Sequence, residues 1–213
     1  MGRGLLVVVS GPSGAGKGTI CRAIHSQYKD LYYSVSVTTR LPRSGERDGV
    51  DYFFVSPLTF KEMLERGEFL EWARVYDHYY GTPKRAVDEA LAQGRDVLLE
   101  IDVQGALQLK KKMMAGELDR GVFVFVTAPN REQLRARIIG RGTEDPGTIE
   151  KRVQAASMEL QHMKEYDYII INDSLPEAID RFRSILVAEK SRSHRILRDL
   201  NLLEEELYDR STN

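Results

Sequence analysis

The sequence predicts an α/β fold in which a parallel sheet is flanked by helices and carries a small mixed insert and a lid. Apolar runs occur at residues 5–9, 97–101, 122–126 and 168–172. The segments between them have helical spacing, and their continuous rather than alternating hydrophobicity is typical of strands covered on both faces. Ligands of such folds gather at the carboxyl ends of the strands.

Length and composition limit the function classes. The chain has 213 residues, which suits one domain, and its 31 basic and 32 acidic residues nearly cancel. No overall field therefore favours nucleic acid or a membrane surface, and any site for a polyanion must be local. No apolar run approaches the roughly 20 residues needed to span a bilayer. The single Cys21 suits a reducing cytosol, and we expect its thiol to be buried and inert.

A glycine-rich loop follows the first apolar run. It begins G-x-x-x-x-G-K, as phosphate-binding loops do, so backbone N–H groups would surround phosphate oxygens while the lysine reaches the terminal phosphates. Glycine stands where Ser or Thr is expected, which puts a hydroxyl ligand to magnesium in doubt. The simpler alternative is a tight strand-to-helix turn with a solvated lysine. The loop consists of Gly11, Pro12, Ser13, Gly14, Ala15, Gly16, Lys17, Gly18 and Thr19.

A small mixed insert is predicted between the first and second core strands. Residues 34–56 resemble antiparallel strands around a glycine- and proline-containing turn. A short helix follows, with Ser56 as N-cap and Pro57 at its first position. After an extended segment at 69–76, Thr82 and Pro83 are expected to open another helix.

Two later segments stand apart from the core pattern. Residues 141–148 are polar and rich in glycine, and they lie between two arginine-bearing helices, which indicates a mobile flap. From residue 189 the pattern predicts a charged amphipathic helix ending in a polar tail. A solvated terminal helix is the default interpretation, with helix packing or self-association as the alternative.

The insert also carries a candidate second phosphate site. Arg40 and Arg43 flank a proline turn, and Tyr52 and the YYGT run at 79–82 lie further along the insert. Two guanidinium groups and phenolic hydroxyls can converge on one phosphate with fixed geometry. Surface arginines in a hairpin are usually just solvated, but a chain that already grips one set of phosphates is suited to phosphoryl transfer to a second.

The order of these motifs resembles guanylate kinases. GPSGAGKGT, SVSVTTRLPRSGE, DYFFVS, EFLEWA, YYGT, LEIDVQGA, GRGTE and YIIIND occur over about residues 4–190. The resemblance implies a P-loop nucleoside monophosphate kinase that forms ADP and GDP from ATP and GMP with Mg²⁺ in the cytoplasm. It also implies a core at 1–34 and 84–190, with a lid at about 137–155. Residues 35–83 would form the GMP-binding insert, and residues 191–213 would form a terminal helix and tail.

The resemblance also implies roles for single residues. The GMP phosphate would meet Arg40, Arg43, Tyr52 and Tyr80, and the base would meet Ser36, Glu71 and Thr82. A carboxylate suits guanine because the N1–H and the exocyclic amine are adjacent donors. Without the flanking motifs, Glu71 would be interpreted as a solvated carboxylate. Charge on the transferred group would be neutralised by Arg137, Arg141 and Arg152.

Two acidic residues end the strand after the insert. Glu100 and Asp102 are two apart, so both side chains can point to the same side. The resemblance implies that Asp102 holds a magnesium-bound water or contacts the guanine amine. The structural alternative is that Asp102 caps the helix that begins near Val103. After the last core strand, Asn172 is expected near adenine.

Two other functions are compatible with parts of the sequence. An interaction module with the same architecture would bind a peptide, but such modules usually have a degraded phosphate loop and this chain keeps Lys17. A third possibility keeps the chemistry but changes the acceptor from GMP or dGMP to another nucleotide or to a sugar phosphate. The four histidines lack metal-ligand spacing, and we expect them to be structural or exposed: His25, His78, His162 and His194. A homo-oligomer is left open.

Overall fold

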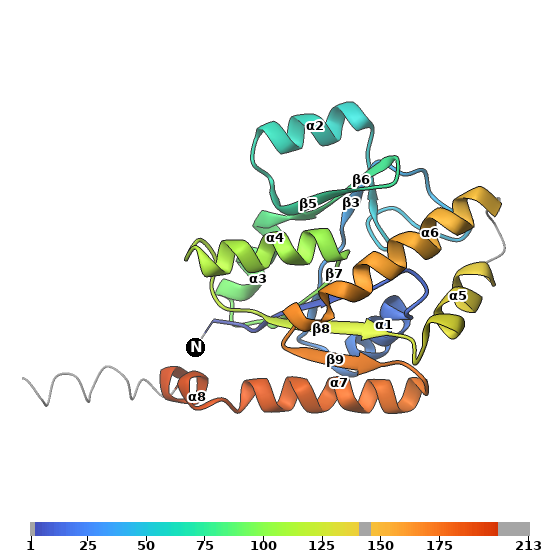
Figure 1. Ribbon diagram of the computed structural model, residues 1–213. Coiled ribbons are helices and arrows are strands. Elements are labelled where there is room, and N and C mark those ends of the chain that lie inside the picture. Colours follow the sequence, from blue (N-terminus) through green and yellow to red (C-terminus); the bar gives the residue numbers. More distant parts are fainter. Residues whose placement is uncertain (1–2, 141–145, 200–213) are drawn as a thin grey trace, which may run out of the picture.

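A five-stranded sheet forms the centre of the protein. The computed structural model describes residues 3–140 and 146–199 (Figure 1). The strand order is β2-β7-β1-β8-β9, and every neighbouring pair is parallel, as predicted. The strands are β1 (Leu6–Ser10), β2 (Tyr32–Tyr33), β7 (Val97–Glu100), β8 (Val122–Thr127) and β9 (Tyr168–Ile171).

Helices cover both faces of this sheet. On one face, α1 (Lys17–Gln27) and α7 (Leu175–Lys190) pack over Val7 and Val9. On the other, α3 (Lys84–Ala92) and α4 (Val103–Met114) pack over Leu6 and Val8. Because alternate residues of β1 enter opposite cores, all of its residues from Leu6 to Val9 are hydrophobic. The thiol of Cys21 lies buried in the first of these cores, as expected.

A second sheet lies beside the first and has the order β4-β3-β6-β5. Its strands are β3 (Val37–Thr38), β4 (Phe53–Phe54), β5 (Phe69–Val75) and β6 (His78–Pro83). The helix α2 (Pro57–Glu65) packs on it through Phe60, whose ring stacks on Phe69 at 4.5 Å between centroids. Ser56 caps α2 by accepting a hydrogen bond from the amide of Thr59, which confirms the predicted start.

Two details of the insert differ from the sequence-based prediction. β3 and β4 pair in parallel, not antiparallel, because a long loop returns Phe53 alongside Val37 in the same direction. Side-chain carboxylates hold that loop: Asp48 accepts the amide of Phe54, and Asp51 accepts the amide of Arg47. The next helix begins at Lys84 with Pro83 as N-cap, so Thr82 belongs to β6.

The predicted lid, about residues 137–155, falls in a segment that contains α5 (Arg131–Ile139), α6 (Pro146–Glu159) and the 3₁₀ turn η1 (Leu160–Glu165). Leu134 and Ile138 of α5 pack against Ala156 of α6 in a small separate core. In Figure 1, α6 crosses in front of the central sheet toward the side of the insert. Part of the predicted flap, 141–145, lies outside the described residues.

The terminal helix is divided. The sequence predicts one amphipathic helix from residue 189, but α7 ends at Lys190 and a separate helix, α8 (Ser193–Asp199), follows. The C-cap of α7 is Ser191, whose hydroxyl donates to the carbonyl of Val187 and so ends the helix locally. The remainder of the predicted tail lies outside the described residues.

Candidate active site

One cleft brings together most of the predicted site residues. It has a volume of about 450 Å³ and lies where the loop after β1, the second sheet and α6 meet. That size suits a small-molecule site. Its walls include the predicted residues Gly11, Ser13, Gly14, Gly16, Lys17, Gly18, Ser36, Arg40, Arg43, Tyr52, Glu71, Tyr80, Asp102 and Arg152.

The other predicted residues take other positions. Pro12, Ala15 and Thr82 are buried next to the cleft wall, and Thr19 is exposed on α1. Arg137 is half-buried on α5 and is not part of the wall. Arg141 lies outside the described residues.

The loop between β1 and α1 has the geometry of an anion site. Gly11 has φ +135°, and a Cβ there would lie 2.1 Å from the carbonyl oxygen of Val126. Only glycine fits so close to the neighbouring strand. The Lys17 ammonium donates to the carbonyls of Gly11 at 2.6 Å and Pro12 at 3.0 Å, which anchors the first helical residue to the loop. The positive end of the α1 dipole thus points into the cleft beside a lysine.

Asn172 supports this loop from behind. Its side-chain amide donates to the carbonyl of Ala15 at 2.8 Å, and the residue is buried. A Cβ on Gly16 would lie 2.3 Å from that amide nitrogen, so glycine is needed here for a packing reason. The contact joins the end of β9 to the loop. The predicted contact of Asn172 with adenine stays a prediction.

Gly18 has a carboxylate beside it. A Cβ on Gly18 would lie 3.3 Å from both carboxylate oxygens of Glu100, at the end of β7. The hydroxyl of Tyr33 donates to Glu100 at 2.5 Å and fixes its position. Glu100 and Asp102 both line the cleft, as their spacing predicts. The position where a serine or threonine hydroxyl is expected is therefore faced by a held carboxylate.

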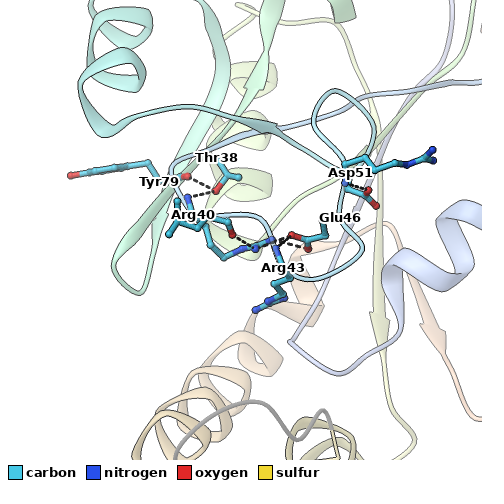
Figure 2. A network of polar contacts seen from close by, with 8 residues as sticks. Thr38, Arg40, Arg43, Glu46, Asp51 and Tyr79 are labelled. Atoms are coloured by element: carbon cyan, nitrogen blue, oxygen red, sulfur yellow. Dashed lines mark hydrogen bonds and ion pairs between the residues drawn. The ribbon is translucent and has the colours of Figure 1, made fainter.

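The arginines of the insert are organised by a residue that sequence reasoning missed (Figure 2). Glu46 accepts hydrogen bonds from both terminal nitrogens of Arg40 and from the backbone amide of Arg43. The Arg40 guanidinium also lies over the ring of Tyr52, 5.4 Å from its centroid. Tyr80 also lies close enough to Arg40 to raise the pKa of its guanidinium. The predicted second anion site is thus a pre-formed cluster.

Glu71 is buried, so the solvated alternative is wrong. Its side chain is 4% exposed, and the Thr82 hydroxyl donates to it at 2.5 Å. Burial raises the pKa of Glu71 to about 7; the negative charge of Asp102 adds to this, while Thr82 and Lys112 oppose it. A Cβ on Gly105 would lie 2.1 Å from the second carboxylate oxygen. Gly105 therefore makes the space in which this carboxylate fits.

Asp102 takes the structural role that the sequence offered, and its contact with a magnesium-bound water or the guanine amine stays a prediction. Its carboxylate accepts the amide of Gly105 at 2.9 Å and caps α4, and it also lines the cleft. Burial raises the pKa of Asp102, whereas the hydrogen bonds from the α4 amides and the charge of Lys17 lower it. The cap therefore fixes a carboxylate close to the lysine of the loop.

Helix α6, in the predicted lid, touches the loop directly. Arg152 is 7% exposed, and its guanidinium donates to the Ser13 hydroxyl. This contact brings a cation from α6 to the wall of the cleft, on the side of the loop. Of the predicted lid arginines, Arg152 is the one that the described structure brings to the loop.

Comparisons with known proteins decide the family. The family profile described as guanylate kinase matches residues 3–189. The chain belongs to the guanylate kinase family. The guanylate kinase of Caldanaerobacter subterraneus subsp. tengcongensis is 53% identical, with 91% of each chain covered. That of Clostridioides difficile is 50% identical over 91% of this chain and 92% of its own.

A solved structure agrees with this assignment. The crystal structure of guanylate kinase from Anaplasma phagocytophilum aligns with a TM-score of 0.75 and 32% identity. The alignment covers 92% of this chain and 90% of that one. The resemblance inferred from the ordered motifs is therefore confirmed, as is the P-loop α/β fold class.

Several absences hold for the described part of this family member. Within residues 3–140 and 146–199, no group of three or more His, Cys, Asp or Glu side chains is arranged to hold a metal ion. In the same residues, no helix is long and apolar enough to cross a membrane. His78 is partly exposed and lies in the cleft wall, which is compatible with the expectation that it is structural or exposed.

Proposed function

We propose that the chain is an ATP:GMP phosphotransferase, which moves the γ-phosphoryl group of ATP to GMP and forms ADP and GDP. One observation carries the proposal: a single cleft has the Lys17 loop on one side and, on another, the Arg40 cluster and the buried Glu71. Two anionic ligands can therefore meet in it. The relatives described above carry the same activity in their names.

The insert side suits GMP. Arg40, Arg43, Tyr52 and Tyr80 would hold its phosphate, because guanidinium forks and phenols together match phosphate oxygens. Ser36, Glu71 and Thr82 would meet the base. Glu71 accepts two donors from guanine only when ionised, and adenine would leave this buried carboxylate without those donors. The same contacts fit dGMP, since none of them addresses the sugar.

The loop side suits ATP. Backbone amides of Gly14, Gly16 and Lys17 would surround the phosphates, and the Lys17 ammonium would leave its carbonyl partners for phosphate oxygens. Thr19 would add a hydroxyl at the start of α1. Asn172 supports the loop from behind, and we propose that it also approaches adenine.

The residues present suit Mg²⁺. Carboxylates that keep water around the ion are its usual protein ligands, and Glu100 beside Gly18 supplies a held carboxylate where the loop lacks a hydroxyl. Glu100 and Asp102 would hold the ion through water. When bound, Mg²⁺ would neutralise charge on the phosphates of ATP.

The chemistry needs no general base. A phosphate oxygen of GMP, already deprotonated near neutral pH, attacks the γ-phosphorus, while the bond from phosphorus to the β–γ bridging oxygen breaks and its electrons leave with ADP. Lys17 and Arg152 stabilise the charge on the transferred group, and Arg137 and Arg141 are predicted to join them when the lid closes. Closure also excludes water, which would otherwise accept the phosphoryl group.

An assay of acceptors tests the proposal. Formation of ADP from ATP would be followed with GMP, dGMP, AMP and CMP as acceptors. We expect kcat/KM to be highest for GMP, with AMP lower by several orders of magnitude. Equal use of GMP and AMP would reject the base assignment, and no ADP with any acceptor would reject the enzyme. A cytoplasmic role in purine nucleotide recycling and the oligomeric state remain predictions.

A further inference from the structure

Side chains of helix α4 hold the outer edge of the second sheet (Figure 1). The strand at that edge is β5, which pairs with β6 on one side and has no strand beyond it among the described residues. The Gln108 side chain donates to the Trp72 carbonyl at 2.6 Å and accepts the Trp72 N–H at 3.5 Å. One turn later, the Lys112 ammonium donates to the Leu70 carbonyl at 2.5 Å.

The spacing of these contacts is that of a helix lying along a strand. Gln104, Gln108 and Lys112 are each four residues apart, so they extend from one face of α4. Their partners are alternate residues of β5, whose carbonyls point to the same side of the strand. Gln104 completes the row, with its amide nitrogen 3.4 Å from the carbonyl oxygen of Arg74. Three successive turns of α4 therefore take the place of a neighbouring strand.

The segment of β5 that is held most closely carries Glu71. This residue lies between Leu70 and Trp72, whose carbonyls accept the two shorter hydrogen bonds. Its buried carboxylate fits against Gly105 of the same helix, where a Cβ would lie 2.1 Å from one carboxylate oxygen. A shift of β5 along α4 would therefore move the carboxylate away from the one position that has room for it.

The contacts connect Glu71 to the central sheet. Ala106 and Leu109 of α4 pack on that sheet, and Asp102 at the start of the helix lines the cleft. The Arg40 cluster lies elsewhere, after β3, and has no part in this row. The hydrogen bonds from α4 thus fix the proposed base-reading carboxylate relative to the core, and they leave the proposed phosphate site aside.

We propose that Gln108 and Lys112 are positioning residues for base recognition, which hold β5 against α4 so that the Glu71 carboxylate stays within reach of the guanine donors. This inference rests on the proposed function, because it assigns Glu71 to guanine. The alternative is that the contacts only cover a sheet edge. Their loss would then lower stability without distinguishing GMP from ADP.

Gln108 gives the cleaner test because it carries no charge. Gln108→Met keeps the length of the side chain and removes both hydrogen bonds to Trp72. We expect the dissociation constant of GMP to rise about tenfold, the effect of one lost hydrogen bond to a charged group, and that of ADP to stay within about twofold. In a Glu71→Gln background the same change should weaken GMP binding by no more than about twofold further, because coupled residues are not additive.

Lys112 provides a second and independent pair of variants. Lys112→Met removes the hydrogen bond to Leu70 together with a positive charge, whereas Lys112→Arg keeps a donor and the charge. We expect the methionine variant to raise the dissociation constant of GMP about tenfold and the arginine variant to stay within about threefold of the wild type. The control is Lys111→Met, which removes the same charge from an exposed position of α4 and should leave GMP binding unchanged.

Binding of GMP and of ADP is measured separately by calorimetry, and the melting temperature checks the fold of each variant. A loss of GMP affinity in Gln108→Met that disappears in the Glu71→Gln background would support the positioning role. Wild-type GMP affinity in Gln108→Met would overturn it, and so would equal weakening of GMP and ADP or a further tenfold loss in the Glu71→Gln background. If Gln108→Met failed to fold, Lys112→Met and Lys112→Arg would provide the same comparison.

The binding measurements also keep this inference separate from the proposed reaction. If the wild type bound GMP but transferred no phosphoryl group, the proposed function would fail while the effect of Gln108 on GMP binding could still be read. If the reaction proceeded and Gln108→Met left the dissociation constant of GMP unchanged, the positioning role alone would fail.

Discussion

Glu46 and Arg40 form a two-pronged ion pair, with 2.9 Å between each terminal guanidinium nitrogen and the carboxylate oxygen it faces (Figure 2). Both side chains are largely buried, at 12% and 19% exposed for Arg40 and Glu46. Burial alone would raise the pKa of Glu46, but the hydrogen bonds from Arg40 and the Arg43 amide outweigh it and lower that pKa. The carboxylate thus fixes the guanidinium before any phosphate arrives.

Removing this support is expected to weaken GMP binding. In Glu46→Ala, Arg40 loses its fixed orientation, and we expect the KM for GMP to rise about tenfold with the KM for ATP unchanged. Steady-state kinetics with each substrate varied in turn would measure both, and Glu62→Ala is the control from an exposed site of the same insert. A lower KM for GMP would instead mean that Glu46 competes with the phosphate for Arg40.

The buried Glu71 is expected to set base specificity. Glu71→Gln keeps the shape of the side chain but replaces one acceptor oxygen with the NH₂ donor of an amide. That donor would face a donor of guanine, so one hydrogen bond is lost. We expect GMP affinity to fall by about 10²-fold or more while ATP affinity persists, as observed generally when a buried polar site is mismatched. Calorimetric titration with GMP and with ADP would measure this, and equal loss for both nucleotides would contradict the base-reading role.

The same residue predicts a pH dependence. Glu71 has a pKa of about 7 and accepts the guanine donors only when ionised. Below pH 7 a proton must leave first, so we expect the KM for GMP to rise about tenfold per pH unit as the pH falls, and to be level above pH 7. Asp102 and Lys112 also face Glu71, and their opposing effects are included in its pKa.

A matched variant isolates this titration. The phosphate of GMP has its own pKa near about 6, as phosphate monoesters do, and contributes to the profile of every variant. Glu71→Gln retains that contribution and lacks the carboxylate, so the slope between pH 6 and 7 should flatten. Identical profiles for the wild type and Glu71→Gln would show that Glu71 does not titrate with GMP binding.

Lys17 is expected to act in catalysis rather than folding. In Lys17→Ala the loop loses the hydrogen bonds to Gly11 and Pro12 and the transferred group loses a cation, so we expect kcat to fall by about 10²-fold or more. The melting temperature should change little. Lys29→Ala, from an exposed site after the same helix, is the control. Wild-type turnover would remove Lys17 from the mechanism.

The core was predictable because its signals are local. Strands buried on both faces are continuously apolar, so the runs that became β1, β7, β8 and β9 are visible in the sequence. The short β2 was missed because Tyr32 and Tyr33 are too few to form a pattern. The direction of β4 was predicted wrongly because parallel pairing to β3 depends on how the intervening loop folds, which the strand residues do not encode.

The site residues divide in the same way between those that a local motif predicts and those that depend on the folded chain. Lys17 and the loop glycines are fixed by a motif with close spacing, and the structure gathers them with the insert residues in one cleft. Glu46 was missed because it is an ordinary acidic residue in a polar segment. Its importance comes from its partner Arg40, whose guanidinium meets the Glu46 carboxylate only in the folded chain.

A crystal structure of the chain with GMP and a non-hydrolysable ATP analogue tests the central claim most directly. The account predicts the GMP phosphate at Arg40 and Arg43, its base at Glu71, and the γ-phosphate of the analogue at Lys17, in line with a phosphate oxygen of GMP. GMP bound away from the arginines, or an analogue whose phosphates lie outside the loop, would contradict it.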